Sequence, residues 1–350
     1  MKISQRAIKT VVVSSVIALT STLVGVSTSH AAETLNVYAA LDYSQDVATA
    51  FTAKTGIPVT VTALSTGPLL AKITAEKNNP QWGIYWADGA EPCASFDLDK
   101  QLLPYTPAGT KFSLLGKKLQ PSTRAYNVTG FTEMVGVLYN SSKIAKPKTW
   151  DDLTTAKYKG QVGMNNPTIS GPTFPFIAGL MNQLGSEQAG KDYLASLKKN
   201  GLQIFDKNSK TIKAMETGVI NVGLVQSSAA ITEVNKLNAA PVKGFTPAVT
   251  YFSKTTILPS CIAIDAHASA GQQSAAKQFV DFAFSTEGQT IMKASNFGDS
   301  LFFPTVQGGV ASPAAGAIPT LAANLIQIVD PYKWGPIQGE VNDWFTKNIA

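Results

Sequence analysis

Two short segments carry the residue types that bind anions. Ser65-Thr66-Gly67-Pro68 and Ser170-Gly171-Pro172-Thr173 each place hydroxyl groups and a glycine directly before a predicted helix. Free backbone N–H groups and the positive end of the helix dipole meet at such a position and attract negative charge. Glycine allows a ligand to approach the backbone closely. Ordinary helix capping is the alternative interpretation of each segment alone, but two of them, in different halves of the chain, predict an anion site between two lobes.

Further polar residues follow the predicted strands. They are Asp42, Tyr43, Asp88, Gln226, Ser227 and Ser228. The carboxyl ends of strands line the ligand crevice in open α/β sheets, although each residue alone also suits a cap or a turn. Arg124 is the only arginine beyond residue 6. A lone arginine suits bidentate recognition of an anion, and a surface position is the alternative.

The signatures of catalysis are sparse. The chain has no GxxxxGK[ST], GxGxxG, GxSxG or HExxH pattern, and His267 is the only histidine after residue 30. A secreted α/β hydrolase or lyase stays as an alternative of another class, but it would depend on His267. We therefore predict a protein that is not an enzyme and that needs no cofactor and no metal.

The N-terminus predicts export to the periplasm. MKISQRAIK is a basic segment, VVVSSVIALTSTLVGV is apolar, and Ser29-His30-Ala31 suits cleavage after Ala31. Cleavage removes Lys2, Arg6 and Lys9 and leaves a nearly neutral chain with scattered lysines, so we expect no nucleic-acid partner. In an oxidising compartment, Cys93 and Cys261, the only cysteines, most simply form one disulfide.

Strand and helix patterns alternate along the chain, and 350 residues suffice for about two domains. Residues 34–40, 58–64 and 82–87 have strand patterns, and residues 44–55 and 65–77 have helical ones. The alternation predicts an α/β fold with mainly parallel sheets. At the C-terminal end, residues 311–319 have the composition of a loop, and residues 321–329 and 339–349 are predicted helices.

Through an ordered set of short matches, the chain resembles the type II periplasmic solute-binding proteins of ABC importers, in the family 1 extracellular solute-binding group. The matches include Leu35-Asn36-Val37-Tyr38, Lys54-Thr55-Gly56-Ile57, Thr149-Trp150-Asp151-Asp152-Leu153, Tyr158-Lys159-Gly160 and Ser285-Thr286-Glu287-Gly288-Gln289. Within this group the chain is similar to receptors for ferric ion and for aminoethylphosphonate or sugar phosphates.

The resemblance implies a two-lobed α/β fold with a ligand cleft between lobes that are joined by two crossover strands. The first lobe would comprise residues 32–135 and 255–310, and the second residues 136–254, with residues 311–350 packed on the lobes. Such a protein is a monomer that closes around its ligand by a hinge and delivers it to an ABC transporter permease. The resembled fold also places the strands near Cys93 and Cys261 side by side, which supports the disulfide.

The expected ligand class follows from one position at which this chain differs from the ferric receptors. They carry adjacent tyrosines where this chain has Gln226-Ser227-Ser228, and a trivalent cation needs anionic oxygen ligands. We therefore expect a small organic anion, a phosphonate or phosphate ester, whose ammonium or hydroxyl group meets Asp42, Asp88 or Glu133. The alternative is a ferric receptor that uses Asp42, Glu133 and a synergistic anion. The predicted ligand-binding residues are Asp42, Tyr43, Ser65, Thr66, Gly67, Asp88, Arg124, Glu133, Ser170, Gly171, Thr173, Gln226, Ser227 and Ser228.

Overall fold

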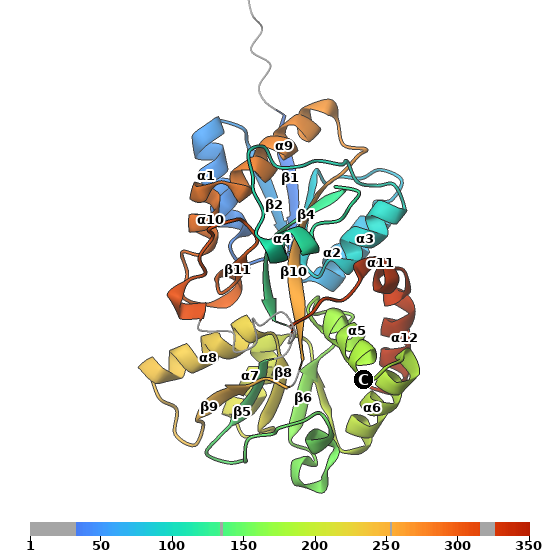
Figure 1. Cartoon of the computed structure of the whole chain (residues 1–350), viewed down its shortest axis with the longest axis vertical. Helices are drawn as coiled ribbons and strands as arrows, with labels where there is room; N and C mark the ends of the chain where they lie inside the picture. Colours follow the sequence, from blue (N-terminus) through green and yellow to red (C-terminus); the bar gives the residue numbers. More distant parts are fainter. Residues whose placement is uncertain (1–32, 134–135, 253, 316–325) are drawn as a thin grey trace, which may run out of the picture. The chain divides into compact units, whose positions relative to one another are not determined.

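The structure, a computed structural model, describes residues 33–133, 136–252, 254–315 and 326–350. The predicted signal peptide lies outside these residues. Two β-sheets organise the described chain, and we call the elements around each sheet a lobe (Figure 1). None of the helices in the described residues is long and apolar enough to cross a bilayer.

The first lobe contains a seven-stranded mixed sheet in the order β11-β4-β10-β3-β1-β2, with β12 beside β10. Its strands are β1 (Leu35–Ala39), β2 (Val59–Ala63), β3 (Ile84–Asp88), β4 (Tyr126–Glu133), β10 (Thr255–Ile264), β11 (Phe303–Pro304) and β12 (Ile326–Gln327). Its helices are α1 (Ser44–Thr55), α2 (Thr66–Ala75), α3 (Glu91–Leu98), α4 (Leu114–Leu119), α9 (Ala270–Phe284) and α10 (Thr286–Met292).

The second lobe contains a five-stranded sheet in the order β7-β6-β8-β5-β9. Its strands are β5 (Gly136–Asn140), β6 (Val162–Asn165), β7 (Gln203–Phe205), β8 (Val222–Val225) and β9 (Pro247–Thr250). Its helices are α5 (Thr173–Gln183), α6 (Glu187–Lys199), α7 (Asn208–Glu216) and α8 (Ser227–Ala239). β4 and β5 are consecutive strands in different sheets, as are β9 and β10, so the chain passes between the lobes at these two places.

The prediction of mainly parallel sheets is wrong. β1 runs parallel to β2 and β3, and β6 runs parallel to β7 and β8. The strands beside the crossovers pair differently: β10 is antiparallel to β3 and β4, and β5 is antiparallel to β8 and β9. A chain that leaves a lobe and later returns to it re-enters in the opposite direction, and the local strand pattern contains no sign of that reversal.

Local sequence accounts well for the elements that flank the cleft. α1 covers the predicted residues 44–55 and ends at Gly56, whose φ of 73° is a left-handed conformation that favours glycine. Its buried residues Val47 and Phe51 lie one helical turn apart and pack in the first-lobe core with Phe279 of α9. The spacing of the apolar residues therefore fixes which face of α1 turns inward.

The predicted disulfide between Cys93 and Cys261 is confirmed. Cys93 lies in α3 and Cys261 in β10, and their Cα atoms are 6.7 Å apart. Both residues are fully buried, so the bridge fastens α3 to the central part of the first-lobe sheet.

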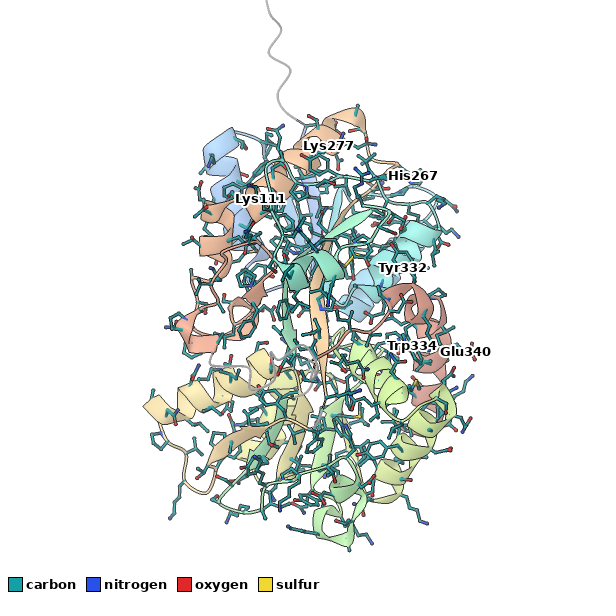
Figure 2. All side chains as sticks on the ribbon, in the orientation of Figure 1. Lys111, His267, Lys277, Tyr332, Trp334 and Glu340 are labelled. Carbon is teal, nitrogen blue, oxygen red and sulfur yellow. A yellow bond between two sulfur atoms is a disulfide. The ribbon has the colours of Figure 1, made fainter. Side chains whose placement is uncertain are left out.

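The C-terminal segment contacts both lobes. Tyr332, in α11 (Pro331–Trp334), donates a hydrogen bond of 2.7 Å to Asp97 of α3, whereas Phe345, in α12 (Gln338–Asn348), packs in the second-lobe core (Figures 1 and 2). The predicted helix over residues 339–349 is thus present as α12. The helix predicted over 321–329 is wrong where the structure describes it, because Ile326 and Gln327 pair with β10 as a strand. An apolar run of this length suits either conformation, and the neighbouring strand decides.

Candidate ligand-binding cleft

A cavity of about 550 Å³ is lined by residues of both lobes. Its volume lies within the range of small-molecule sites. Seven residues of the predicted set line it, namely Asp42, Ser65, Thr66, Asp88, Ser170, Gly171 and Gln226. Residues outside that set also line it, among them Lys207, Asn208, Ser209, Glu216, Thr232, Glu233, Lys236, Phe297, Gly298 and Asp299.

The two segments that precede α2 and α5 touch each other at the cavity. The backbone N–H of Gly67 donates a hydrogen bond of 3.2 Å to the carbonyl oxygen of Ile169. A methyl group on Gly171 would lie 2.6 Å from Cβ of Thr66, so only a glycine leaves room for this approach. The side chain of Ser65, the N-cap residue of α2, makes no capping hydrogen bond. Ser170 lies two residues before the N-cap residue of α5, Pro172, and its hydroxyl accepts a hydrogen bond of 3.2 Å from Nδ2 of Asn165. A side-chain cap therefore does not account for Ser65.

Four helices begin at the cavity wall, and none of them has a side-chain cap. They are α2, α5, α7 and α8. Ser186 and Ser269 cap α6 and α9, which lie away from the cavity lining, whereas α1, α3 and α12, whose residues do not line the cavity either, also have no side-chain cap. Within the described residues, the N–H groups of Ser227, Ser228 and Ala229 in the first turn of α8 have no hydrogen-bond partner. Uncapped N–H groups at a helix start favour a bound anion.

Lys207 adds a positive charge at the same wall. It is the residue directly before α7, and Asn208 and Ser209 of the first turn also line the cavity. The side chain of Asn208 is held by Nδ2 of Asn165, which donates to its Oδ1 over 2.6 Å. The sequence offered a usable signal here, because Lys-Asn-Ser lies between a strand and a helix as the two predicted segments do.

Three aspartates of the first lobe form an acidic floor, which we define as Asp42, Asp88 and Asp299. The N–H of Asp42 donates to Oδ2 of Asp299 over 2.8 Å, and the Ser260 hydroxyl donates to Asp88. Burial, and to a lesser extent the charge of Asp42, raises the pKa of Asp88 to about 7. Burial and the charges of Asp88 and Asp42 raise the pKa of Asp299 well above its ordinary value. The floor therefore resists carrying three negative charges at once.

Glu216 and Glu233 place two more carboxyl groups on the second-lobe wall. Burial and then the neighbouring charge of Glu216 raise the pKa of Glu233, and Lys236 partly offsets this. Glu216 also forms an ion pair of 2.8 Å with Lys213. The cavity thus combines helix starts and lysines with several carboxyl groups, so it offers partners for both signs of charge.

One loop of the first lobe closes the cavity against α8. Gln226 donates from Nε2 to Oδ1 of Asp299 over 3.1 Å, and the N–H of Gly298 donates to Oγ1 of Thr232 over 2.9 Å. The Lys236 ammonium lies 5.9 Å from the ring centroid of Phe297. These contacts join the two lobes. The loop that makes them, residues 297–299, contains no motif from which the sequence could have predicted them.

Seven predicted residues lie outside the cavity lining. Tyr43 is buried against Trp86 and Phe302, and burial raises the pKa of its hydroxyl. Thr173 is buried at the start of α5, and Gly67 contacts Ile169 as described. The remaining four are Arg124, which is exposed at a φ of 59°, and Glu133, Ser227 and Ser228, which are buried. The Ser227 hydroxyl accepts a hydrogen bond from the N–H of Glu133, and the Ser228 hydroxyl accepts one from Nε2 of Gln226.

His267, on which the enzymatic alternative depends, lies on the first lobe (Figure 2) and is absent from the cavity lining. Its Nδ1 is 3.3 Å from Oδ1 of Asp265. Asp265 is buried, and no cavity-lining hydroxyl takes part in this pair.

Comparisons with known proteins identify the family. Residues 46–320 match the family model described as bacterial extracellular solute-binding protein. A putative 2-aminoethylphosphonate-binding periplasmic protein of Salmonella typhimurium is 25% identical over 253 residues, 71% of each chain. The major ferric iron-binding protein of Neisseria meningitidis is 26% identical over 263 residues, 72% of this chain and 75% of that protein.

Solved structures show the same fold. The periplasmic binding protein P5PA has a TM-score of 0.77 at 22% identity and covers 91% of this chain and 99% of its own. AfuA from Actinobacillus pleuropneumoniae, with fructose-6-phosphate bound, has a TM-score of 0.74 at 23% identity. The match covers 90% of this chain and 98% of AfuA. The predicted type II periplasmic binding protein fold is thus confirmed.

The chain belongs to the bacterial extracellular solute-binding protein family. It is a solute-binding protein of an ABC importer, and members of this class bind and deliver small molecules to a transporter permease rather than convert them.

Proposed function

We propose that this protein is a monomeric periplasmic receptor for a small organic phosphonate or phosphate ester, which it delivers to its permease. The cavity between the lobes carries the proposal, because four uncapped helix starts and Lys207 surround it. Phosphonate and phosphate oxygens accept several hydrogen bonds at once, which suits the N–H groups of Ser227, Ser228 and Ala229 at the start of α8. No step of this function requires chemistry on the ligand.

The acidic floor serves the other end of the same ligand. Asp42 and Asp88 were predicted to meet an ammonium or hydroxyl group, and both line the cavity beside Asp299. The comparisons support both variants of this ligand: the Salmonella typhimurium relative is described as binding 2-aminoethylphosphonate, and AfuA was solved with fructose-6-phosphate.

A ferric ion is the second candidate, since the Neisseria meningitidis relative is described as an iron-binding protein. In this chain Gln226, Ser227 and Ser228 provide neutral oxygens where a trivalent cation requires anionic ones. Tyr43 packs between Trp86 and Phe302 in the core. These features favour the phosphonate or phosphate ester over iron.

Native mass spectrometry of protein purified without refolding tests the proposal, followed by calorimetry with 2-aminoethylphosphonate, fructose-6-phosphate and ferric citrate. We expect a co-purified phosphorus-containing molecule and saturable one-to-one binding of at least one phosphorus compound. Binding of ferric citrate alone, with a visible absorption band, would favour the second candidate. Binding of none of the three would refute the proposed ligand class.

A further inference from the structure

The acidic floor lacks a positive partner. Among the described residues, no ion pair includes Asp42, Asp88 or Asp299. The lining lysines, Lys207 and Lys236, belong to the second lobe, at the start of α7 and in the C-terminal half of α8. Asp88 is buried and Asp299 half-buried, whereas Asp42 is exposed. Gathering their carboxyl groups without a cation is costly, because the ionised forms of Asp88 and Asp299 lose water and all three repel one another.

The two donors to Asp299 nevertheless suit an ionised carboxylate. The N–H of Asp42 donates to Oδ2 over 2.8 Å, and Nε2 of Gln226 donates to Oδ1 over 3.1 Å. Hydrogen bonds to a charged acceptor are stronger than neutral ones. Burial and the neighbouring aspartates raise the pKa of Asp299 and oppose that ionisation. A positive charge in the cavity would resolve the conflict, since it favours the ionised carboxylate and so strengthens both bonds.

Asp299 differs from the other two aspartates because it also joins the lobes. Asp88 is already bonded by Ser260 of the same lobe, and Asp42 is exposed. Gln226 stands directly before α8 of the second lobe, so the strength of its bond to Asp299 contributes to closure of the cavity.

We propose that Asp299 is a specificity-determining residue that makes the receptor select ligands with a positively charged group beside the phosphonate or phosphate. The inference rests on the proposed function. The ligand's cation lies on the acidic floor, and the ionised Asp299 then holds Gln226 and the second lobe. A ligand of the same anionic group without a cation leaves the floor unneutralised and closes the cavity less well.

Two probes that differ in the cation test this. Calorimetry at pH 7 compares 2-aminoethylphosphonate with ethylphosphonate, which lacks the amine, in the wild type and in Asp299→Asn. We expect the wild type to bind 2-aminoethylphosphonate at least about tenfold more tightly, since a hydrogen-bonded charge contributes roughly that much. Asp299→Asn keeps the shape and an oxygen that accepts from Gln226, and it removes the charge. Its NH2 group then faces the N–H of Asp42, a loss that affects the binding of both probes alike. We expect it to lower the affinity ratio of the two probes about tenfold.

Thr232→Val is the matched control. It removes the hydroxyl that accepts the N–H of Gly298 and so weakens the neighbouring contact between the lobes without changing charge. It should lower the affinity for both probes by the same factor and leave the ratio of the two affinities unchanged. An equal affinity of the wild type for the two probes overturns the inference while the proposed function stands, and this arm needs no variant. An unchanged ratio in Asp299→Asn also overturns it. Failure of the wild type to bind either probe or fructose-6-phosphate overturns the proposed function, and the inference falls with it.

Discussion

Replacing Gly67 by alanine should weaken closure of the cleft between the lobes without lowering the stability of either lobe. Gly67 lies in the first turn of α2, and its N–H bonds the carbonyl oxygen of Ile169 in the other lobe. A methyl group at this position would lie 1.9 Å from the carbonyl oxygen of Thr168, which is a rigid backbone atom. The clash arises only between the lobes. We therefore expect Gly67→Ala to hold the cleft open and leave each lobe intact.

The size of the effect follows from that distance. A carbon and an oxygen atom in contact need about 3.2 Å, so the two backbones must part by more than about 1 Å, and the Gly67–Ile169 hydrogen bond of 3.2 Å is lost. Forced overpacking of this kind costs about 1–3 kcal/mol. Only the closed state bears the cost, so ligand affinity should fall by about 5- to 150-fold.

Calorimetry with the ligand found by native mass spectrometry measures the affinity, and small-angle scattering at saturating ligand measures closure. Gly339→Ala is the control, because a methyl group there meets nothing within 4 Å. The melting temperature of ligand-free Gly67→Ala should equal or slightly exceed that of the wild type, since alanine favours a helix over glycine. Wild-type affinity in Gly67→Ala would refute the role of this contact in the ligand-bound state. A large loss of stability without ligand would show that the contact serves the fold instead.

Three further predictions concern the anion site, the disulfide and a buried carboxyl group. Lys207→Ala should weaken phosphonate binding about tenfold by calorimetry, whereas Lys210→Ala, three residues further along the chain in α7 and outside the cavity lining, should not; equal effects would contradict the role of Lys207. Replacing both Cys93 and Cys261 by serine should lower the free energy of unfolding in urea by about 5 kcal/mol in the chain-entropy model, because the two residues are 168 positions apart; an unchanged unfolding midpoint would contradict it. Burial raises the pKa of Glu91 to about 7, so its proton is bound more tightly in the folded chain, and its contribution to stability is present below about pH 4.5 and is lost as the pH rises through 7. Glu91→Gln should therefore flatten the decline of the free energy of unfolding between pH 4.5 and 8, by at most about 3 kcal/mol, and a decline equal to that of the wild type would refute this assignment.

Much of the fold could be predicted from the chain itself because its signals are local. The helix over residues 44–55 follows from the spacing of Val47 and Phe51 and from Gly56 at its end. The segments before α2 and α5 were recognisable because a hydroxyl, a glycine and a proline together mark a helix start. The same pattern identified Ser65, Thr66, Ser170 and Gly171, which are four of the seven predicted residues that line the cavity.

The tertiary structure decided the features that depend on distant pairing. Asp299 reaches Asp42 across 257 positions and Gln226 across 73, from a loop whose own sequence predicts neither contact. Ile326 and Gln327 form a strand because β10 is there to pair with them, and Arg124 is exposed because its backbone turns at the chain's surface. Helix starts are set within about four residues, so the sequence by itself determined where the helices beside the cavity begin. The acidic floor exists only when the loop at Gly298 brings Asp299 to Asp42 and Asp88 in the folded first lobe, since desolvation and mutual repulsion of these carboxyl groups arise from that packing.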